Sequence, residues 1–155
     1  MLSALSIILC IPAGIDAFYG NNQWQSFTFS SLICLFFGII LILANKSDNF
    51  NLSIKQTFLL TTLSWIFIAF FGSLPFIFSN LELSFTDAFF ESMSGITTTG
   101  STILSGLDHL PHGILIWRSL LQWIGGIGIV VIAIAFLPIL KVGGMQLFHT
   151  ESADS

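Results

Sequence analysis

Residues 91–103 have the sequence ESMSGITTTGSTI, a polar stretch within a chain that is otherwise largely hydrophobic. The stretch contains one carboxylate, two glycines and a run of serine and threonine residues, and long apolar segments lie on both sides of it. Backbone N–H and C=O groups at membrane depth are costly unless protein buries them or they line a water-filled cavity. The stretch therefore predicts either a specialised site inside the protein or a loop outside the membrane.

The composition is typical of a membrane protein. Of the 155 residues, 54% are hydrophobic and only 8% are charged, and the mean hydropathy is +0.92. Soluble domains carry about 25% charged residues, so we expect an integral membrane protein. The four lysine and arginine residues are too few for a phosphate-binding surface, and we therefore expect no nucleic-acid partner.

Four apolar segments approach the length of about 20 residues that a membrane-spanning helix needs. They cover residues 2–18, 27–44, 55–78 and 113–140. The first segment is slightly short, and we place Asp16, near its end, at the membrane interface. The predicted fold is an all-α integral membrane protein with four transmembrane helices.

The basic residues predict the orientation, because cytoplasmic loops carry an excess of lysine and arginine. Lys46 and Lys55 flank the second connection, and Lys141 follows the last apolar segment. The third connection, residues 80–112, contains acidic residues and no lysine or arginine. We therefore expect both chain ends to be cytoplasmic, although Arg118, at the outer end of the last segment, disagrees mildly.

The third connection contains a predicted short helix. Ser84 and Asp87 have the spacing of a capping box, in which the serine hydroxyl satisfies free amides and the acid lies at the positive helix end. We expect the helix to cover residues 85–94 and to end at Gly95. At 1.5 Å per residue it would be about 15 Å long, half the thickness of the hydrocarbon core. A half-length helix followed by irregular backbone predicts a re-entrant pore helix and filter loop between the third and fourth spans.

The segment that follows this helix is a candidate ion-binding site. It consists of Thr97, Thr98, Thr99, Gly100 and Ser101. The carboxyl end of a helix carries a partial negative charge, and extended carbonyl groups there can replace the water around a cation. Glycine also allows backbone angles that other residues avoid. The residues alone leave an alternative open, namely an outer amphipathic helix followed by a flexible loop with no role in permeation.

Two further features concern packing around this segment. Glu91 lies one helical turn after Asp87, and Arg118 is the only basic residue on that side. We hypothesise a Glu91–Arg118 contact; in the alternative, Arg118 reaches the interface and Glu91 meets water or amides. Small residues at Gly125 and Gly128 permit close helix packing, which we expect behind the candidate filter.

The longer motifs resemble a known family. FTDAFFESMSGITTTGSTIL (residues 85–104) and WRSLLQWIGGIGIVVIAIAFLPILKVGGMQLFHTES (residues 117–152) are similar to the first pore unit of the Trk/Ktr/HKT cation transporters. Within that superfamily the similarity is greatest to the bacterial TrkH type. The resemblance implies potassium uptake across the bacterial inner membrane by four linked helix–pore loop–helix units.

The resemblance also implies a division of the chain. Residues 1–52 would be a two-helix preamble and residues 53–142 the first pore unit, with a filter at residues 97–101. Residues 143–155 would be a cytoplasmic tail or the start of a linker to a second repeat.

The resemblance implies that potassium binds at Thr98, Thr99 and Gly100, mainly through backbone carbonyls, and glycine at position 100 goes with potassium selectivity. Potassium would be the transported substrate, with no covalent cofactor and no enzymatic activity. The implied partners are the remaining pore repeats, a second copy in a homodimer, and a cytosolic TrkA-type nucleotide-binding subunit.

A single pore loop cannot enclose an ion. We therefore expect a fragment of a longer transporter that is inactive alone, or else an assembly of four copies. The competing hypothesis is a small helical membrane scaffold or assembly subunit whose outer loop binds a protein.

Overall fold

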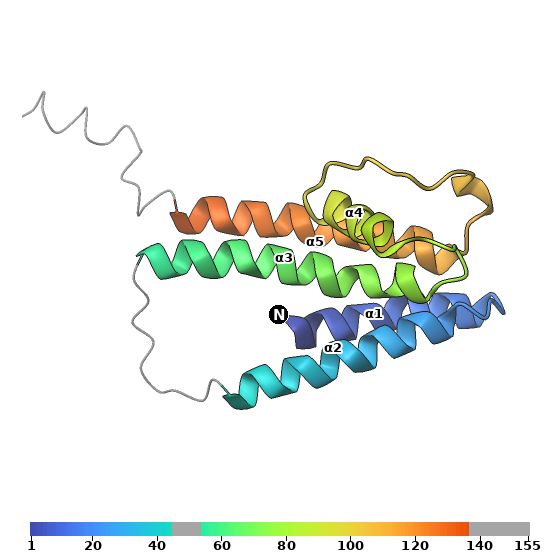
Figure 1. Cartoon of the computed structure of the whole chain (residues 1–155), viewed down its shortest axis with the longest axis horizontal. Coiled ribbons are helices and arrows are strands. Elements are labelled where there is room, and N and C mark those ends of the chain that lie inside the picture. Colours follow the sequence, from blue (N-terminus) through green and yellow to red (C-terminus); the bar gives the residue numbers. More distant parts are fainter. Residues whose placement is uncertain (45–53, 137–155) are drawn as a thin grey trace, which may run out of the picture.

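The computed structural model describes residues 1–44 and 54–136, and all regular structure in these ranges is helical. The elements are α1 (Leu2–Phe18), α2 (Trp24–Ala44), α3 (Ile54–Phe78), α4 (Phe85–Ile96), the short 3₁₀ turn η1 (Leu107–His109) and α5 (His112–Phe136). The four longer helices run side by side, and α4 lies against α3 and α5 near one end of the bundle (Figure 1). The predicted helical class is confirmed for this part of the chain. The predicted tail and the basic residues Lys46 and Lys141 lie outside the described ranges.

Three of the described helices are long and apolar enough to cross a membrane. Their spanning segments are Trp24–Ala44, Lys55–Phe78 and His112–Ile134, whereas α1 is apolar but has only 17 residues. The prediction that the second helix begins at residue 27 was wrong by one turn, because a helical backbone satisfies its own hydrogen bonds and can include polar residues such as Gln25 and Ser26.

Small residues allow α1 and α2 to pack closely. A Cβ atom added to Gly38 would lie 2.9 Å from the backbone nitrogen of Ser3, so only glycine permits this approach. Further along the pair, the Ser31 hydroxyl donates to the carbonyl of Ser6 at 2.8 Å. Helices in lipid associate through such close contacts and interhelical hydrogen bonds, since burial of apolar surface from water contributes nothing there.

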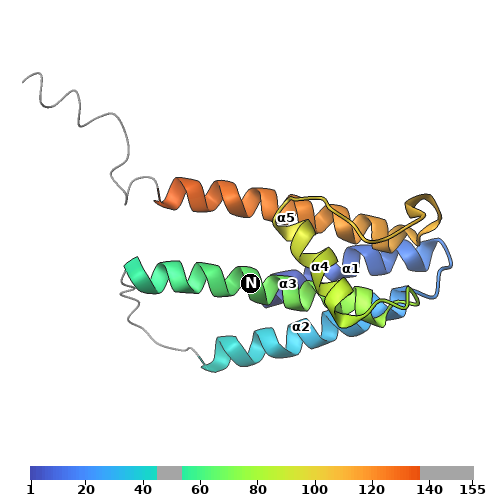
Figure 2. The same ribbon diagram turned by 45° about the horizontal axis from the view of Figure 1, so that its top comes forward.

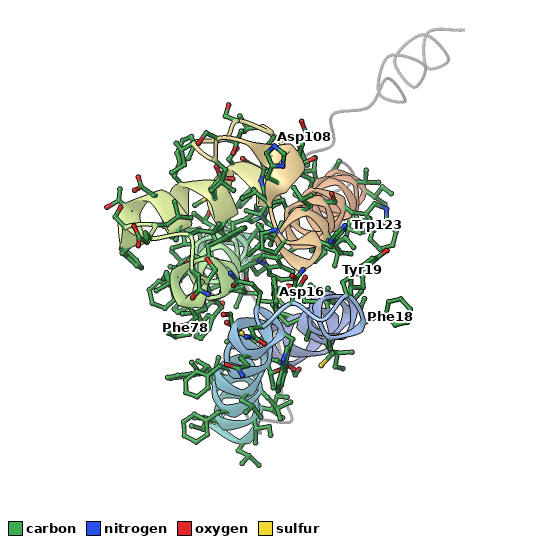
Figure 3. The ribbon with its side chains drawn as sticks, turned by 90° about the vertical axis from the view of Figure 1, so that its right-hand side faces the viewer. Asp16, Phe18, Tyr19, Phe78, Asp108 and Trp123 are labelled. Carbon is green, nitrogen blue, oxygen red and sulfur yellow. The ribbon has the colours of Figure 1, made fainter. Side chains whose placement is uncertain are left out.

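A buried carboxylate joins this helix pair to α5. Asp16 is fully buried, and its Oδ1 accepts a hydrogen bond of 2.8 Å from the backbone N–H of Gly113. Gly113 is the second residue of α5, so Asp16 satisfies one of the amides that every helix leaves free at its start. Figure 3 shows Asp16 facing into the bundle, in contrast to Phe18 at its edge. The partner of Asp16 lies 97 residues away in the sequence, so the sequence alone did not indicate this burial, and the interfacial position of Asp16 stays a prediction.

Glycines also line the surface of α3 and α5 against which α4 packs, and α4 lies obliquely across these two helices (Figure 2). A Cβ atom on Gly72 of α3 would lie 2.6 Å from the Ser92 hydroxyl oxygen, and one on Gly125 of α5 would overlap the carbonyl oxygen of Ile96. The indole of Trp117, which is fully buried, donates to the Gly72 carbonyl at 2.9 Å. The expected close packing at Gly125 is thus present at the carboxyl end of α4.

The predicted end of the short helix was wrong. We expected Gly95 to terminate it, yet α4 continues to Ile96 and Gly95 lies inside it. A Cβ atom on Gly95 would lie 3.0 Å from the Cβ of Leu121, so this glycine serves contact with α5. The backbone leaves the helical conformation later, at Thr98, whose φ is 58°.

The packing at Gly125 can be tested by adding one methyl group. We expect Gly125→Ala to lower the free energy of unfolding by about 2 kcal/mol, because overpacking forces the Ile96 carbonyl to move. Gly126→Ala is the matched control, since its Cβ would meet only a Thr98 methyl group at 4.0 Å. Thermal unfolding in detergent measures the difference. Equal melting temperatures for the two variants would contradict the close contact between Gly125 and the carboxyl end of α4.

Candidate ion-binding site

The start of α4 is capped as predicted. The Ser84 hydroxyl oxygen accepts from the backbone N–H of Asp87 at 3.2 Å, and the hydroxyl donates to the Asp87 carboxylate at 2.7 Å. The cap satisfies a free amide and places a negative charge at the positive end of the helix. Asp87 therefore fixes where α4 begins, at the opposite end from the candidate filter.

The end of α4 has the hydrogen bonds of a Schellman motif. The N–H of Thr98 donates to the Gly95 carbonyl at 2.9 Å, and the N–H of Thr99 donates to the Ser94 carbonyl at 3.0 Å. In this motif the residue after the C-cap adopts the left-handed conformation and is usually glycine. Here that residue is Thr98, and a β-branched side chain at positive φ is a genuine outlier. Such strain is typical of functional sites.

Hydroxyl groups brace the segment that follows. The Thr97 hydroxyl donates to the Met93 carbonyl at 2.8 Å and lies 2.8 Å from the Thr99 hydroxyl. Gly100, with φ of 76°, donates its N–H to the Ser94 carbonyl at 3.3 Å. The segment is thus folded back against the last turn of α4 by both backbone and side-chain bonds.

The carbonyl groups of this segment differ in their availability. Among the hydrogen bonds of the described residues, none is accepted by the carbonyls of Thr97, Thr98, Thr99 or Gly100, and all four residues are exposed. The Ser101 carbonyl accepts a bond of 2.6 Å from the Ser94 hydroxyl. Of the five predicted residues, four therefore have carbonyls without a hydrogen bond among the described residues, which we call the open carbonyls, and the fifth accepts one from Ser94.

Glu91 connects α4 to both of its neighbours. Its side chain is 1% exposed, and Oε2 accepts a hydrogen bond of 3.0 Å from Nε of Arg118 on α5, whose side chain is 14% exposed. Oε1 accepts 2.6 Å bonds from the Thr102 hydroxyl and from the backbone N–H of Ile103. The hypothesised Glu91–Arg118 contact is present. These three hydrogen bonds, one of them from a cation, offset the cost of burying the Glu91 carboxylate.

Sequence reasoning missed two residues of this arrangement, Ser94 and Thr102. Neither belongs to the segment 97–101, yet each forms a 2.6 Å bond that holds the chain beside it. One signal was available for Thr102. A buried carboxylate has two oxygens and needs more hydrogen-bond donors than a single arginine Nε provides, so a nearby hydroxyl could have been expected to donate to Glu91.

A scan against protein families places these features in a wider group. The family described as "TrkH: Cation transport protein" matches residues 23–155. The chain belongs to this TrkH family. The regular structure of its described part is all helical and includes three helices of membrane-spanning length. The open carbonyls lie in the loop that follows α4.

Individual members of the family are closely similar. The chain is 46% identical over 144 residues to the Trk system potassium uptake protein TrkH of Escherichia coli (strain K12), which is 92% of this chain and 30% of that protein. It is 45% identical over 150 residues to the Trk system potassium uptake protein TrkI of Halomonas elongata, 97% of this chain and 30% of that protein. The chain thus spans about a third of the length of the curated relatives it matches.

A solved structure shows the same fold. The crystal structure of the potassium transporter TrkH from Vibrio parahaemolyticus matches with a TM-score of 0.86 and 39% sequence identity, over 98% of this chain and 33% of that chain. The arrangement of α1 to α5 is therefore that of one part of a TrkH-type membrane transporter.

The Glu91–Arg118 pair can be tested by a double-mutant cycle with methionine, which keeps most of the side-chain volume. We expect Arg118→Met to cost about 3 kcal/mol of unfolding free energy, because it leaves a buried carboxylate without its cation. The double variant with Glu91→Met should cost at least about 1 kcal/mol less than the sum of the single changes. Denaturant unfolding in detergent measures each corner, and additive costs would show that the two charges do not stabilise one another.

Proposed function

We propose that the chain supplies the first ion-binding unit of a TrkH-type potassium transporter, in which carbonyls of residues 97–100 replace water around potassium. The observation that carries this proposal is the set of four carbonyls, all in exposed residues, that accept no hydrogen bond among the described residues. They follow the carboxyl end of α4, where aligned peptide dipoles attract a cation. Rings of backbone carbonyls are the ligands of potassium filters.

The surrounding charges suit permeation. The nearby carboxylate, Glu91, is buried and paired with Arg118, so it offers no free negative charge to the ion. An ion must bind firmly enough to enter and weakly enough to leave. Neutral carbonyl ligands meet both requirements.

The proposal includes a re-entrant pore loop and a defined orientation. The chain leaves α4, passes along the bundle and returns through η1 to the end at which α5 begins (Figure 1). Glu82 and Asp108 flank this end, and Lys55 lies at the start of α3. By the distribution of basic residues, the pore loop is on the outer side of the bacterial inner membrane and both termini are cytoplasmic. The short helix α1 is the fourth span.

The proposed unit works only with others. Residues 1–52 form the preamble and residues 53–142 the first unit, and further pore units complete a ring around the ion. The relatives named as potassium uptake proteins are about three times as long, which supports this arrangement. A homodimer and a TrkA-type nucleotide-binding subunit belong to the same proposal. No covalent step is required, so the protein is a transporter and not an enzyme.

The test uses a chimeric transporter, in which this chain replaces the matching third of the Vibrio parahaemolyticus TrkH. In a bacterium that lacks potassium uptake, the chimera should restore growth at low potassium. We expect Gly100→Asp to abolish this rescue, because a carboxylate beside the open carbonyls retains the cation and blocks its passage.

Gly106→Asp is the matched control. Gly106 has φ of 66° and no neighbour within 4 Å, so the backbone strain resembles that at Gly100, with φ of 76°, but the site is outside the filter. Growth should persist in this variant. If both variants rescue growth equally, the filter role of Gly100 is refuted and the membrane scaffold hypothesis is favoured.

A further inference from the structure

We infer that Ser94 sets the direction of the filter carbonyls and keeps the Ser101 carbonyl out of the set that binds the ion. The inference rests on the proposed function, because it assigns a role to a residue beside the filter and not within it. Ser94 lies in the last turn of α4 and is 6% exposed. Its backbone and its hydroxyl both bond to the filter segment.

The Ser94 carbonyl accepts hydrogen bonds from two backbone amides of the filter segment. It accepts from the N–H of Thr99 at 3.0 Å and from that of Gly100 at 3.3 Å. In a planar trans peptide the N–H of one residue and the C=O of the residue before it point in opposite directions. The bonds that draw these two amides toward α4 therefore direct the carbonyls of Thr98 and Thr99 away from it. These are the groups that would meet an ion.

The Ser94 hydroxyl has the opposite effect two residues later. It donates to the carbonyl of Ser101 at 2.6 Å and so turns this carbonyl toward α4. The direction of the carbonyls thus reverses between Thr99 and Ser101. Gly100, with φ of 76°, is the residue at which the backbone makes this reversal. One serine therefore fixes both the direction of the open carbonyls and the point at which the open set ends.

Removing only the hydroxyl should change selectivity. Ser94→Ala keeps the backbone carbonyl and its two amide bonds but releases the Ser101 carbonyl from its 2.6 Å bond. The released carbonyl can turn toward the ion path and add a poorly fixed ligand. A less fixed ligand set distinguishes less sharply between potassium and the smaller sodium ion.

The chain offers a matched control on the same helix. Ser92 is two residues earlier and fully buried, and its hydroxyl has no hydrogen-bond partner within the described residues. Ser92→Ala removes the same atom from a similarly buried position without touching the filter segment. A second pair, Ser94→Thr and Ser94→Val, keeps side-chain volume constant and differs only in the hydroxyl.

The experiment measures radioactive rubidium uptake by the chimeric transporter in proteoliposomes, with potassium or sodium as the competitor. We expect Ser94→Ala to reduce the preference for potassium over sodium about fivefold, the equivalent of one hydrogen bond of about 1 kcal/mol. Ser94→Thr should retain most of the preference and Ser94→Val should lose it. Ser92→Ala should leave it unchanged, and the melting temperatures should not follow the preference.

Two results would overturn the inference. In the first, Ser94→Ala keeps the original preference; in the second, Ser94→Thr and Ser94→Val have equal preferences, which means that only packing matters. If Ser94→Ala does not fold, the Thr and Val pair decides alone. Failure of the proposed function is distinguishable, because Gly100→Asp would then support uptake whatever the Ser94 variants do.

Discussion

The arrangement of this protein depends on one buried carboxylate. Glu91 has almost no contact with solvent, and its two oxygens take bonds from Arg118 on α5 and from Thr102 and Ile103 in the returning chain. A charge in that position is stable only if every partner is in place. The requirement fixes α4 relative to α5 and also holds the chain just beyond the open carbonyls. The segment 97–101 is therefore anchored on its far side by Glu91 and on its near side by the last turn of α4.

Close packing makes these bonds possible. Glycines at positions 72, 95 and 125 let α4 approach α3 and α5 so nearly that an added Cβ would collide or press on a neighbour. Asp16 on α1 caps α5, so α1 also helps to position the amino-terminal end of the helix that carries Arg118. Two described non-glycine residues, Glu82 and Thr98, have positive φ, and Thr98, at φ of 58°, turns the chain from α4 to the open carbonyls.

Much of the fold follows from local sequence, and the remainder depends on distant contacts. Three of the four predicted spans and the capped start of α4 were predictable because they depend on neighbouring residues. The Glu91–Arg118 contact could be hypothesised because Arg118 is the only lysine or arginine between Lys55 and Lys141 in the sequence. The end of α4 was not predictable, because Gly95 serves close packing against Leu121 on α5 and does not terminate the helix. The burial of Asp16 was missed for the same reason. The residue pattern and the family resemblance both indicated the candidate filter, but the hydrogen bonds of Ser94 depend on how the chain folds back against α4.

Hydrogen exchange measures most directly whether the Glu91 carboxylate holds the open carbonyls in place. The double variant Glu91→Met with Arg118→Met leaves no unpaired charge and removes only the anchor. Amide exchange in residues 97–104 should become at least about tenfold faster, a loss of about 1.4 kcal/mol of local stability, while α2 is unaffected. Unchanged exchange in residues 97–104 would show that packing alone fixes the segment and would contradict the central role of Glu91.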